Sequence, residues 1–324
     1  MKKIDKSISG IKQMHLASLF PSQKLLVVNR FDEISESFDS LPDQRPCTCG
    51  AFALMYLFGP LGFVRHEGND LLAEDYLAHL ASVVVEENEV ATSEAVGLLV
   101  SRGLLVEDEA RKLFPKVWYR YPVQSSSVEA MLGTSPSGVA RAIALGTQGA
   151  LVSLPIPARR GDGSIQLNEV VWHELLNLLA LKIDVWNWHA ILNYQLTSTL
   201  NPVHLAYTKE NLQLKDPTSV IPLDDWDAGH FVGVGGLWTG SNQPWLLLLD
   251  SAKHRGFNGY QPQPGELIRQ GLIRSDGRGG GIHLILESEH LEKALKELRA
   301  LELEFSMWSN GSPEPTDWVW KLGS

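Results

Sequence analysis

Three residues far apart in the sequence carry the side chains of a thiol-dependent catalytic site. Cys49 follows a turn with two prolines (residues 42–46) and begins the apolar segment 49–58, which is predicted to be a buried helix. Unpaired N–H groups and the helix dipole at a helix N-terminus favour the thiolate, the nucleophilic form of cysteine. The Cys49 amide is positioned to donate to an oxyanion, and the small residues Gly50 and Ala51 are expected to leave space for substrate beside the sulfur. Alternatively, Cys49 is a small buried apolar residue.

A histidine and an aspartate stand at the two ends of a predicted β-hairpin. His230 begins the predicted strand 230–238 and Asp250 ends the next, 245–250, with Gly240 midway between them. In an antiparallel hairpin these two ends lie opposite each other, and side chains directly opposite share a face with Cβ atoms about 5 Å apart. We therefore expect Asp250 to orient the His230 ring. The alternative is a hairpin whose ends are polar because they meet water.

The second cysteine permits other chemistry. Cys47 and Cys49 form a C-x-C pair, which with distant histidines is sometimes a zinc site, but such sites usually have four clustered ligands and no second pair is present. We therefore predict no metal and no other cofactor. Cys47 is then a bystander, or a resolving thiol that protects Cys49 from over-oxidation. Two cysteines this close cannot link distant segments, and free thiols suit a reducing compartment, so we expect a cytoplasmic protein.

Other residues compete less well for a catalytic role. His204 and His283 adjoin apolar strands but have no acid at hairpin spacing, so both are expected to be core histidines. His254 follows Asp250 closely and is a candidate cleft residue. The glycine-rich stretch 277–281 does not open a helix after a strand, so it is interpreted as a mobile loop rather than a phosphate cradle. The Trp226 side chain is placed to shield the histidine and aspartate from water.

The predicted helices and strands that would position these residues form a single α+β domain, 1–324. We divide it into an N-terminal helix-and-loop preamble (1–40), a mainly helical part (41–180), a mainly β part (181–290), and a C-terminal helix and tail (291–324). The predicted helices are 49–58, 70–85, 93–102 (begun by a Thr-Ser cap), 135–145, 168–180, 265–273 and 288–305, and the predicted strands are 150–156, 230–238, 245–250 and 282–287. The segment 181–217 is ambiguous.

Composition and charge argue against several classes of protein. Hydrophobic residues make up 44% of the 324, enough to fill a sizeable core. The net charge of −10 repels a phosphate backbone, so we expect no nucleic-acid partner. No stretch reaches the ~18 apolar residues of a membrane span, so no membrane partner is expected. No apolar run follows the N-terminal lysines, which argues against a secretory signal and therefore against a cell-wall amidase of the NlpC type.

With these motifs in view, the chain resembles the papain-like cysteine peptidase superfamily, and most closely the double-glycine leader peptidases and related bacterial families. The matching stretches are Gln44, the sequence CGAFAL at 49–54, HFVGV at 230–234 and LLDS at 248–251. The resemblance implies a nucleophile helix packed on a C-terminal antiparallel sheet, with further helices inserted over the cleft. It also implies that Cys49 is the nucleophile, His230 the general base and Asp250 the residue that orients the ring. Gln44 would be the second oxyanion donor, beside the Cys49 amide.

These residues favour acyl transfer through a thioester. If water accepts the acyl group, the protein is a peptidase or amidase acting on a peptide or another amide-containing molecule. If an amine accepts it, the protein is an acyltransferase. A third interpretation, from a different class, is a papain-like scaffold that binds a peptide or protein without catalysis. The sequence does not distinguish among these or indicate the oligomeric state.

Overall fold

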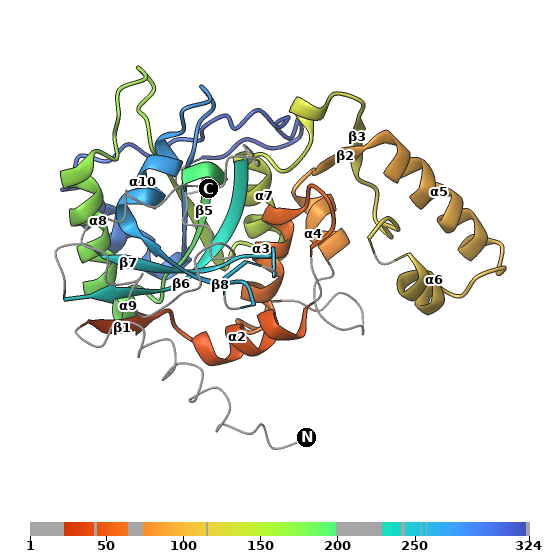
Figure 1. Cartoon of the computed structure of the whole chain (residues 1–324), viewed down its shortest axis with the longest axis horizontal. Coiled ribbons are helices and arrows are strands. Elements are labelled where there is room, and N and C mark those ends of the chain that lie inside the picture. Colours follow the sequence, from red (N-terminus) through yellow and green to blue (C-terminus); the bar gives the residue numbers. More distant parts are fainter. Residues whose placement is uncertain are drawn as a thin grey trace.

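The structure is a computed structural model that describes residues 23–41, 44–63, 74–114, 116–198, 229–240, 244–253, 255–256 and 258–321. Its described helices are α2 (Phe31–Ser40), α3 (Cys49–Phe58), α4 (Glu74–Leu80), α5 (Glu87–Ser101), α6 (Glu107–Leu113), α7 (Pro136–Gly146), α8 (Glu169–Leu181), α9 (Ile183–Trp186), α10 (Gly265–Ile273) and α11 (Leu291–Arg299). Its described strands are β1 (Lys24–Val27), β2 (Val84–Glu86), β3 (Gln124–Ser126), β4 (Leu151–Pro157), β5 (His189–Gln195), β6 (Gly229–Thr239), β7 (Trp245–Leu249), β8 (Tyr260–Pro264) and β9 (Gly281–Glu287). The fold is α+β (Figure 1).

A seven-stranded antiparallel sheet forms the centre of the molecule. Its order is β4-β9-β5-β6-β7-β8, and β1 pairs with the distal half of β6. The long strand β6 therefore holds three others: β5 along its first residues, β7 along its second half on the other edge, and β1 beyond β5. Most residues of the sheet are buried, which explains the near-continuous apolar sequences of β6, β7 and β9.

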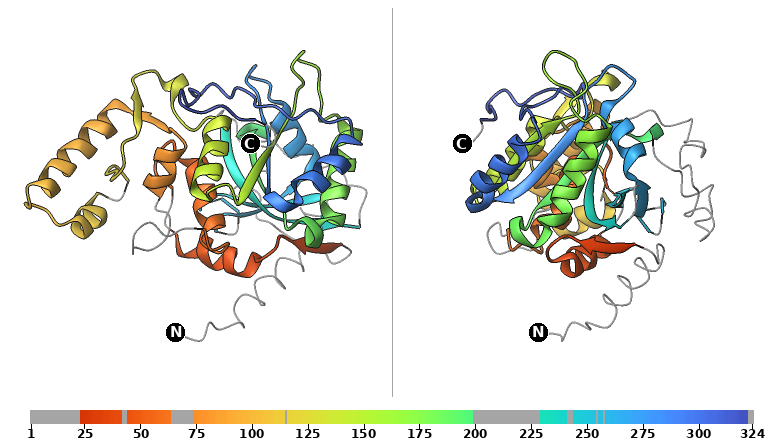
Figure 2. Two further views of the ribbon diagram at one scale, coloured as in Figure 1. Left: turned by 180° about the vertical axis from the view of Figure 1, so that it is seen from behind. Right: turned by 90° about the vertical axis from the view of Figure 1, so that its left-hand side faces the viewer.

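The helices pack around this sheet in two groups. Helices α3, α4 and α7 lie together, with α3 packed on β6 and α7 on β4, whereas α8, α10 and α11 lie at the other side of the molecule (Figures 1 and 2). Every residue of α3 from Gly50 to Phe58 is buried. A helix that is apolar on all sides belongs in a core, and α3 is the central element of this one.

The hydroxyl of Tyr56 docks α3 onto the β6–β7 hairpin. It accepts a hydrogen bond from the Gly233 N–H at 2.8 Å and donates one to the Leu249 carbonyl at 3.1 Å. Gly233 and Leu249 are partners across the hairpin. A Cβ at position 233 would lie 2.2 Å from the Tyr56 oxygen, so this close approach requires glycine. The start of α3 is thereby fixed relative to the ends of both strands.

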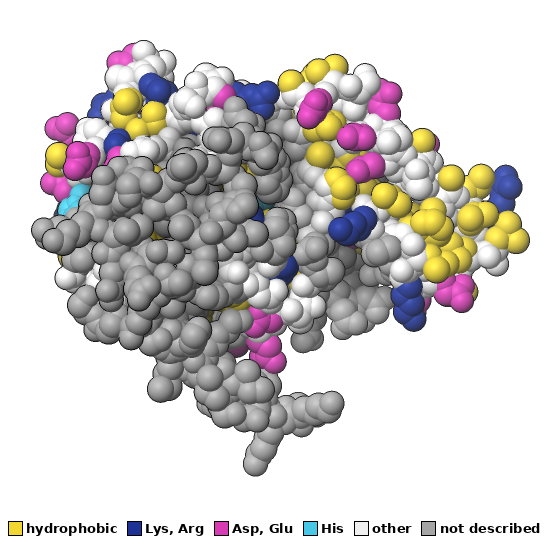
Figure 3. Space-filling view, viewed as in Figure 1, with side chains coloured by type: hydrophobic (Ala, Val, Ile, Leu, Met, Phe, Trp, Pro, Cys, Tyr) yellow, Lys and Arg dark blue, Asp and Glu magenta, His cyan; other side chains and the backbone are white. Residues whose placement is uncertain are grey.

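Residues 84–126, here called the arm, project from the body (Figure 1). Strands β2 and β3 pair in parallel at its base, and α5 and α6 enclose a small separate core made by Val96, Ala110 and Trp118. Hydrophobic side chains are exposed toward its far end, and Figure 3 shows them gathered there: Leu98, Leu99, Leu104, Val106 and Leu113. The arm accounts for part of the long interval between Cys49 and His230.

Several sequence expectations require correction. The N-terminal segment 1–40 was expected to contain only helix and loop, but residues 24–27 form β1, because their short apolar run completes the sheet beside β6. Residues 84–86 form β2 rather than the end of a helix. Helix α5 begins at Glu87, earlier than the Thr-Ser cap suggested, and the last helix ends at Arg299 rather than near 305. In the 277–281 stretch, Gly277 has open space around it, but Gly279, Gly280 and Gly281 are tightly packed: a Cβ at Gly280 would lie 2.3 Å from the Leu272 carbonyl oxygen.

Other expectations are confirmed. Helices α3, α7, α8 and α10 and strands β4, β6, β7 and β9 lie within about one residue of their predicted bounds. Asn168 caps α8 with two hydrogen bonds, and Ser135 caps α7 with one. Within the described ranges, no helix is both long enough and apolar enough to cross a membrane.

We predict that Tyr56→Phe destabilises the protein by about 1–3 kcal/mol, because the Gly233 N–H and the Leu249 carbonyl lose their buried partner. The measurement is the free energy of unfolding in urea. Tyr119→Phe is a matched control, since the buried Tyr119 hydroxyl has no hydrogen-bond partner among the described residues and its loss should cost little. Equal effects of the two substitutions would contradict the docking role of Tyr56.

Candidate active site

Cys49 is the first residue of α3 and is partly exposed, so a substrate can reach its sulfur. The first hydrogen bond of the helix runs from the Phe52 N–H to the Thr48 carbonyl at 2.8 Å. The amides of residues 49–51 therefore precede the helical hydrogen-bond ladder. Thr48, at the N-cap position, makes no side-chain capping bond to them. The helix thus presents its positive end beside the sulfur without a competing hydroxyl.

Gly50 and Ala51 do not leave space for substrate, contrary to expectation. Both are buried, and a Cβ at Gly50 would lie 3.0 Å from methyl groups of Thr134 and Val139. Glycine is required here because α3 packs closely against the segment that leads into α7. The glycine after Cys49 thus serves the packing of α3, and the candidate role of Cys49 is unaffected.

His230 and Asp250 are in contact, as the sequence predicts. His230 Nε2 donates to Asp250 Oδ1 at 2.9 Å, and both side chains are almost fully buried. The ring of Tyr194, the partner of His230 across β5 and β6, lies edge-on to the imidazole at 6.4 Å between centroids. The pair is therefore screened from water, which strengthens its electrostatic attraction.

Cys49 lies close enough to the His230 ring to act on its pKa. Burial lowers the pKa of His230, but the charge of Asp250, the hydrogen bond that the ring donates to Asp250, and the interaction with Cys49 raise it to about 10. A ring with this pKa carries a positive charge at neutral pH. Residues expected from three separate motifs thus form one contiguous site.

A β-bulge in β6 sets the geometry of this pair. The register of β6 against β7 shifts between Val234 and Gly236, so Gly235 is an extra residue in the ladder. A Cβ at Gly235 would lie 3.0 Å from the ring of Phe31, which explains why the bulged residue is a glycine. In the observed register Asp250 is not directly opposite His230, contrary to what the even spacing around Gly240 had suggested.

The shift decides which face of the sheet each side chain occupies. Gly233 pairs with Leu249, and continuing that register by one residue places Asp250 opposite Val232. Val232 and His230 are two residues apart on one strand, so Asp250 and His230 share a face as a diagonal pair. If the register beyond Gly236 continued through Gly235 without a bulge, Asp250 would stand opposite Gly233 and on the other face from His230.

Three further groups hold the Asp250 carboxylate. Its Oδ1 also accepts from the Ala252 N–H at 2.9 Å, while Oδ2 accepts from Arg255 at 3.4 Å and from the side-chain amide of Gln261. Burial raises the pKa of Asp250, but the attraction of His230 and Arg255 and these hydrogen bonds lower it overall. The carboxylate is therefore charged and fixed, as a ring-orienting residue must be.

Gln44 lies next to this cluster. Its side-chain carbonyl oxygen accepts a hydrogen bond from the hydroxyl of Ser251, the residue that follows Asp250. The opposite end of the amide, Nε2, carries the donors that an oxyanion requires. All four residues that the sequence singled out thus belong to one region: Cys49, His230, Asp250 and Gln44.

A buried glutamate anchors the loop that carries the nucleophile. Glu74 accepts from the Arg45 N–H at 2.8 Å and from the Thr48 hydroxyl, and it faces the Arg45 guanidinium at 3.7 Å. Burial raises the pKa of Glu74, and the hydrogen bonds from Thr48 and Arg45 oppose that shift. The Thr48 hydroxyl also lies within hydrogen-bond distance of the Arg45 carbonyl at 2.8 Å, so Glu74 and the loop backbone together fix this side chain.

Of His204, His254, His283 and Trp226, which were considered for other roles, only His283 lies within the described residues. His283 is fully buried, bonded to the Ser153 hydroxyl at 2.8 Å and packed on Trp308, and burial lowers its pKa to about 3. It is a neutral core histidine. The other expectations in this group, for His204, His254 and Trp226, lie outside the described residues.

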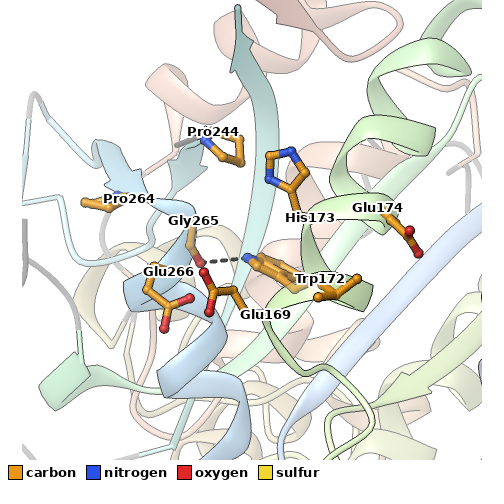
Figure 4. A pocket seen from close by; sticks show the side chains of 9 residues that line it. Glu169, Trp172, His173, Glu174, Pro244, Pro264, Gly265 and Glu266 are labelled. Carbon is orange, nitrogen blue, oxygen red and sulfur yellow. Dashed lines mark hydrogen bonds between the residues drawn. The ribbon is translucent and has the colours of Figure 1, made fainter. Parts of the chain in front are cut away.

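One cluster with metal-ligand spacing and one hollow, both among the described residues, lie away from the candidate site. Among the described residues, groups with metal-ligand geometry are limited to Glu287, Glu289 and His290, and include neither cysteine. A hollow of about 410 Å³ lies between the starts of α8 and α10 (Figure 4), where Trp172 donates to the Gly265 carbonyl at 2.9 Å. Its lining includes Pro244, just before β7, whereas Asp250 follows the other end of that strand.

Sequence reasoning missed the supporting residues. Gln261 could have been recognised as a supporting residue, because a glutamine at a buried position of a strand needs a hydrogen-bond partner. Tyr56 lies seven residues after Cys49, two helical turns along the same face, a spacing that was available. Arg255 and Glu74 stand in no recognisable pattern. Their roles depend on contacts between segments distant in sequence.

The raised pKa of His230 makes part of the stability pH-dependent. The contribution is fully present below the unfolded value near 6.5 and is lost as the pH rises toward about 10. We expect the difference in unfolding free energy between the wild type and His230→Gln to shrink by at least about 1 kcal/mol from pH 6 to pH 9. Urea unfolding at both pH values measures it. A pH-independent difference would show that the ring is not charged in the folded protein.

Comparison with known proteins adds a family but no activity. No curated protein matches the chain. One family model, described as a family of unknown function (DUF6885), matches residues 28–309, which include β6, β7 and all four candidate site residues. Because the match spans most of the chain, the protein belongs to the DUF6885 family.

Proposed function

We propose that the protein is a thiol-dependent acyl-transfer enzyme with a papain-like arrangement of a Cys49–His230–Asp250 triad. The observation that carries the proposal is the buried His230–Asp250 pair at 2.9 Å, with Cys49 close enough to the same ring to raise its pKa. The order of the elements supports it too, since the cysteine begins a central buried helix and the other two residues end paired antiparallel strands. The preferred reaction is hydrolysis of a peptide or amide.

The chemistry follows from the geometry. The Cys49 thiolate attacks the carbonyl carbon, and the carbonyl π electrons move to oxygen to give an oxyanion. The Cys49 amide and Gln44 Nε2 stabilise that charge. The His230 imidazolium gives its proton to the leaving amine as the C–N bond breaks, leaving a thioester. The neutral ring then removes a proton from water or an amine, which attacks the thioester and releases the thiolate.

The two acceptors define two reactions at one site. With water the product is a carboxylic acid, and with an amine the product is a new amide. Both cysteines are free, and a reactive thiolate persists in a reducing compartment, so we propose the cytoplasm as the location.

The first test measures alkylation of Cys49 by iodoacetamide as a function of pH, in a Cys47→Ser background. We expect rapid labelling below pH 7 that slows at least about tenfold in His230→Ala, because the imidazolium stabilises the thiolate. Slow labelling of equal rate in both proteins would instead identify a non-catalytic scaffold.

The second test separates oxyanion stabilisation from thiolate formation. We predict that Glu74→Ala slows release of nitrophenolate from p-nitrophenyl acetate at least about tenfold, because the loop loses its anchor at the Arg45 N–H and the Thr48 hydroxyl and the amides that receive the oxyanion lose their fixed direction. Alkylation by iodoacetamide forms no oxyanion and should change less than about threefold. Equal losses in the two assays would mean that Glu74 acts only on the thiolate or on stability.

A further inference from the structure

A second buried cation contacts the carboxylate of the candidate triad. Asp250 Oδ1 accepts from His230 Nε2 at 2.9 Å, and Arg255 Nη1 lies 3.4 Å from Oδ2. The side chains of Arg255 and Asp250 are 1% and 0% exposed, so solvent screens their attraction very little. Removing a guanidinium from water is costly, and one carboxylate oxygen is enough to orient the ring. The buried arginine therefore requires a reason beyond orientation of the imidazole.

The segment after β7 places this guanidinium on its own aspartate. The Ala252 N–H donates to Asp250 Oδ1 at 2.9 Å, and the Arg255 N–H donates to the Ala252 carbonyl at 2.9 Å. The Gly259 N–H donates to the Arg255 carbonyl at 2.8 Å, and the Asp250 N–H donates to the Gly259 carbonyl at 2.8 Å. These bonds return the chain to Asp250. The same turn thus fixes both the carboxylate and the arginine.

Three neutral side chains approach the pair from α3, β5 and β8. Tyr194 on β5 presents its ring edge-on to the imidazole, and Tyr56 on α3 donates to the carbonyl of the residue before Asp250. Burial raises the pKa of Tyr56, so its phenol stays protonated. Gln261 on β8 donates its side-chain amide to Asp250 Oδ2. Phenols and amides add hydrogen bonds or packing to the site, but no charge.

A second arginine nearby has an acid of its own. A Cβ at Gly229, the residue before His230, would lie 2.3 Å from Arg274 Nη1, so this guanidinium borders the start of β6. Its Nε donates to Asp276 at 3.0 Å, and its Nη2 donates to the other oxygen of the same carboxylate. The charges of this pair largely cancel at a distance. Within the described part of the chain, Arg255 is the cation that acts on the triad carboxylate in addition to the imidazole.

The proposed reaction makes opposite demands on the imidazole. As an acid, the ring must hold a proton until the amine leaves, and as a base it must be neutral when water or an amine attacks the thioester. The charge of Asp250 favours the protonated ring, and a pKa of about 10 would return a proton to the ring before the second step. The acyl-enzyme therefore requires a lower proton affinity than the free enzyme.

Two differences in charge supply that lower affinity. In the acyl-enzyme the Cys49 sulfur is bonded to the acyl carbon and carries no charge, so it no longer favours the protonated ring. Arg255 attracts the triad carboxylate from its other oxygen, and a positive charge close to a titrating group lowers the pKa of that group. A guanidinium stays charged at every pH of interest, so its effect persists through both steps.

We propose that Arg255 is a positioning residue that acts through Asp250 to keep the His230 ring neutral in the acyl-enzyme, so that the ring accepts a proton from water or an amine. The inference rests on the proposed function, because it concerns the regulation of that same site by pH. The leaving amine takes one proton from the imidazolium, and the ring regains one from the attacking water or amine as the thiolate leaves. Loss of the Arg255 charge therefore moves the second step to higher pH.

The primary test follows hydrolysis of the acetyl-enzyme formed from p-nitrophenyl acetate as a function of pH, in a Cys47→Ser background. The rate rises with pH as the ring loses its proton. We expect Arg255→Gln, which keeps a hydrogen-bond donor without the charge, to move the midpoint of this rise upward by at least about one pH unit. Arg255→Lys keeps the charge and should move the midpoint by less than about 0.3 unit. Gln261→Leu removes a neutral donor from the same oxygen and should move it by less than about 0.5 unit.

A second measurement needs neither catalysis nor a substrate. In a Cys49→Ala background, which lacks the nucleophile, the titration of the His230 ring is followed by NMR. Arg255→Gln should raise the midpoint of this titration by at least about one pH unit, whereas Arg255→Lys should not. If Arg255→Gln does not fold, Arg255→Met replaces it in both experiments, because methionine fills part of the same buried space without charge.

The outcomes separate this inference from the proposed function. Midpoints that are the same with arginine, lysine and glutamine at position 255 overturn the role of Arg255, even if iodoacetamide labels Cys49 rapidly and His230→Ala abolishes that labelling. Lower rates at every pH with an unmoved midpoint overturn it too, because they identify a purely structural support. Slow labelling that does not depend on His230 overturns the catalytic proposal instead. In that case, an NMR midpoint that follows the charge at position 255 still supports control of the ring by the guanidinium.

Discussion

The structure depends on one buried ion pair that requires support from every side. An imidazolium and a carboxylate removed from water are stable only when each remaining polar atom has a partner. Here His230 meets Cys49 and Asp250, and Asp250 also receives Arg255, Gln261 and a backbone N–H. These groups lie on α3, on β6, on β8 and in the segment that follows β7. The pair therefore ties the nucleophile helix to the sheet.

The helix that bears the nucleophile is held at its start and in its middle. Tyr56 binds the hairpin two turns after Cys49, and Glu74 binds the loop just before it. These anchors lie on opposite sides of the sulfur along the chain. They fix the direction of the uncapped amides of α3, and amides that are already oriented need no reorganisation when negative charge develops.

The sequence predicted the fold class, most of the sheet and the members of the site, because those depend on local patterns. Apolar periodicity located α3, α8 and α10, and the alignment of His230 and Asp250 with strand ends located the pair. Strand β1 was missed because four residues carry little pattern, and β5 and β8 of the same sheet were not predicted either. The roles of Glu74 and Arg255 were missed because they depend on tertiary contacts. The hairpin register was wrong by two residues, because Asp250 lies opposite Val232 rather than His230, and no spacing rule reveals where a bulge occurs.

That additional residue has a consequence for how the hairpin tolerates insertions and deletions. The relative facing of His230 and Asp250 is set by the ladder between Gly235 and the open end of the hairpin, and the closed end contributes nothing to it. The connection between β6 and β7 is therefore free to vary in length. Loss of a single residue between His230 and Gly235 would reverse the parity of the imidazole and separate it from the carboxylate, while leaving every strand intact.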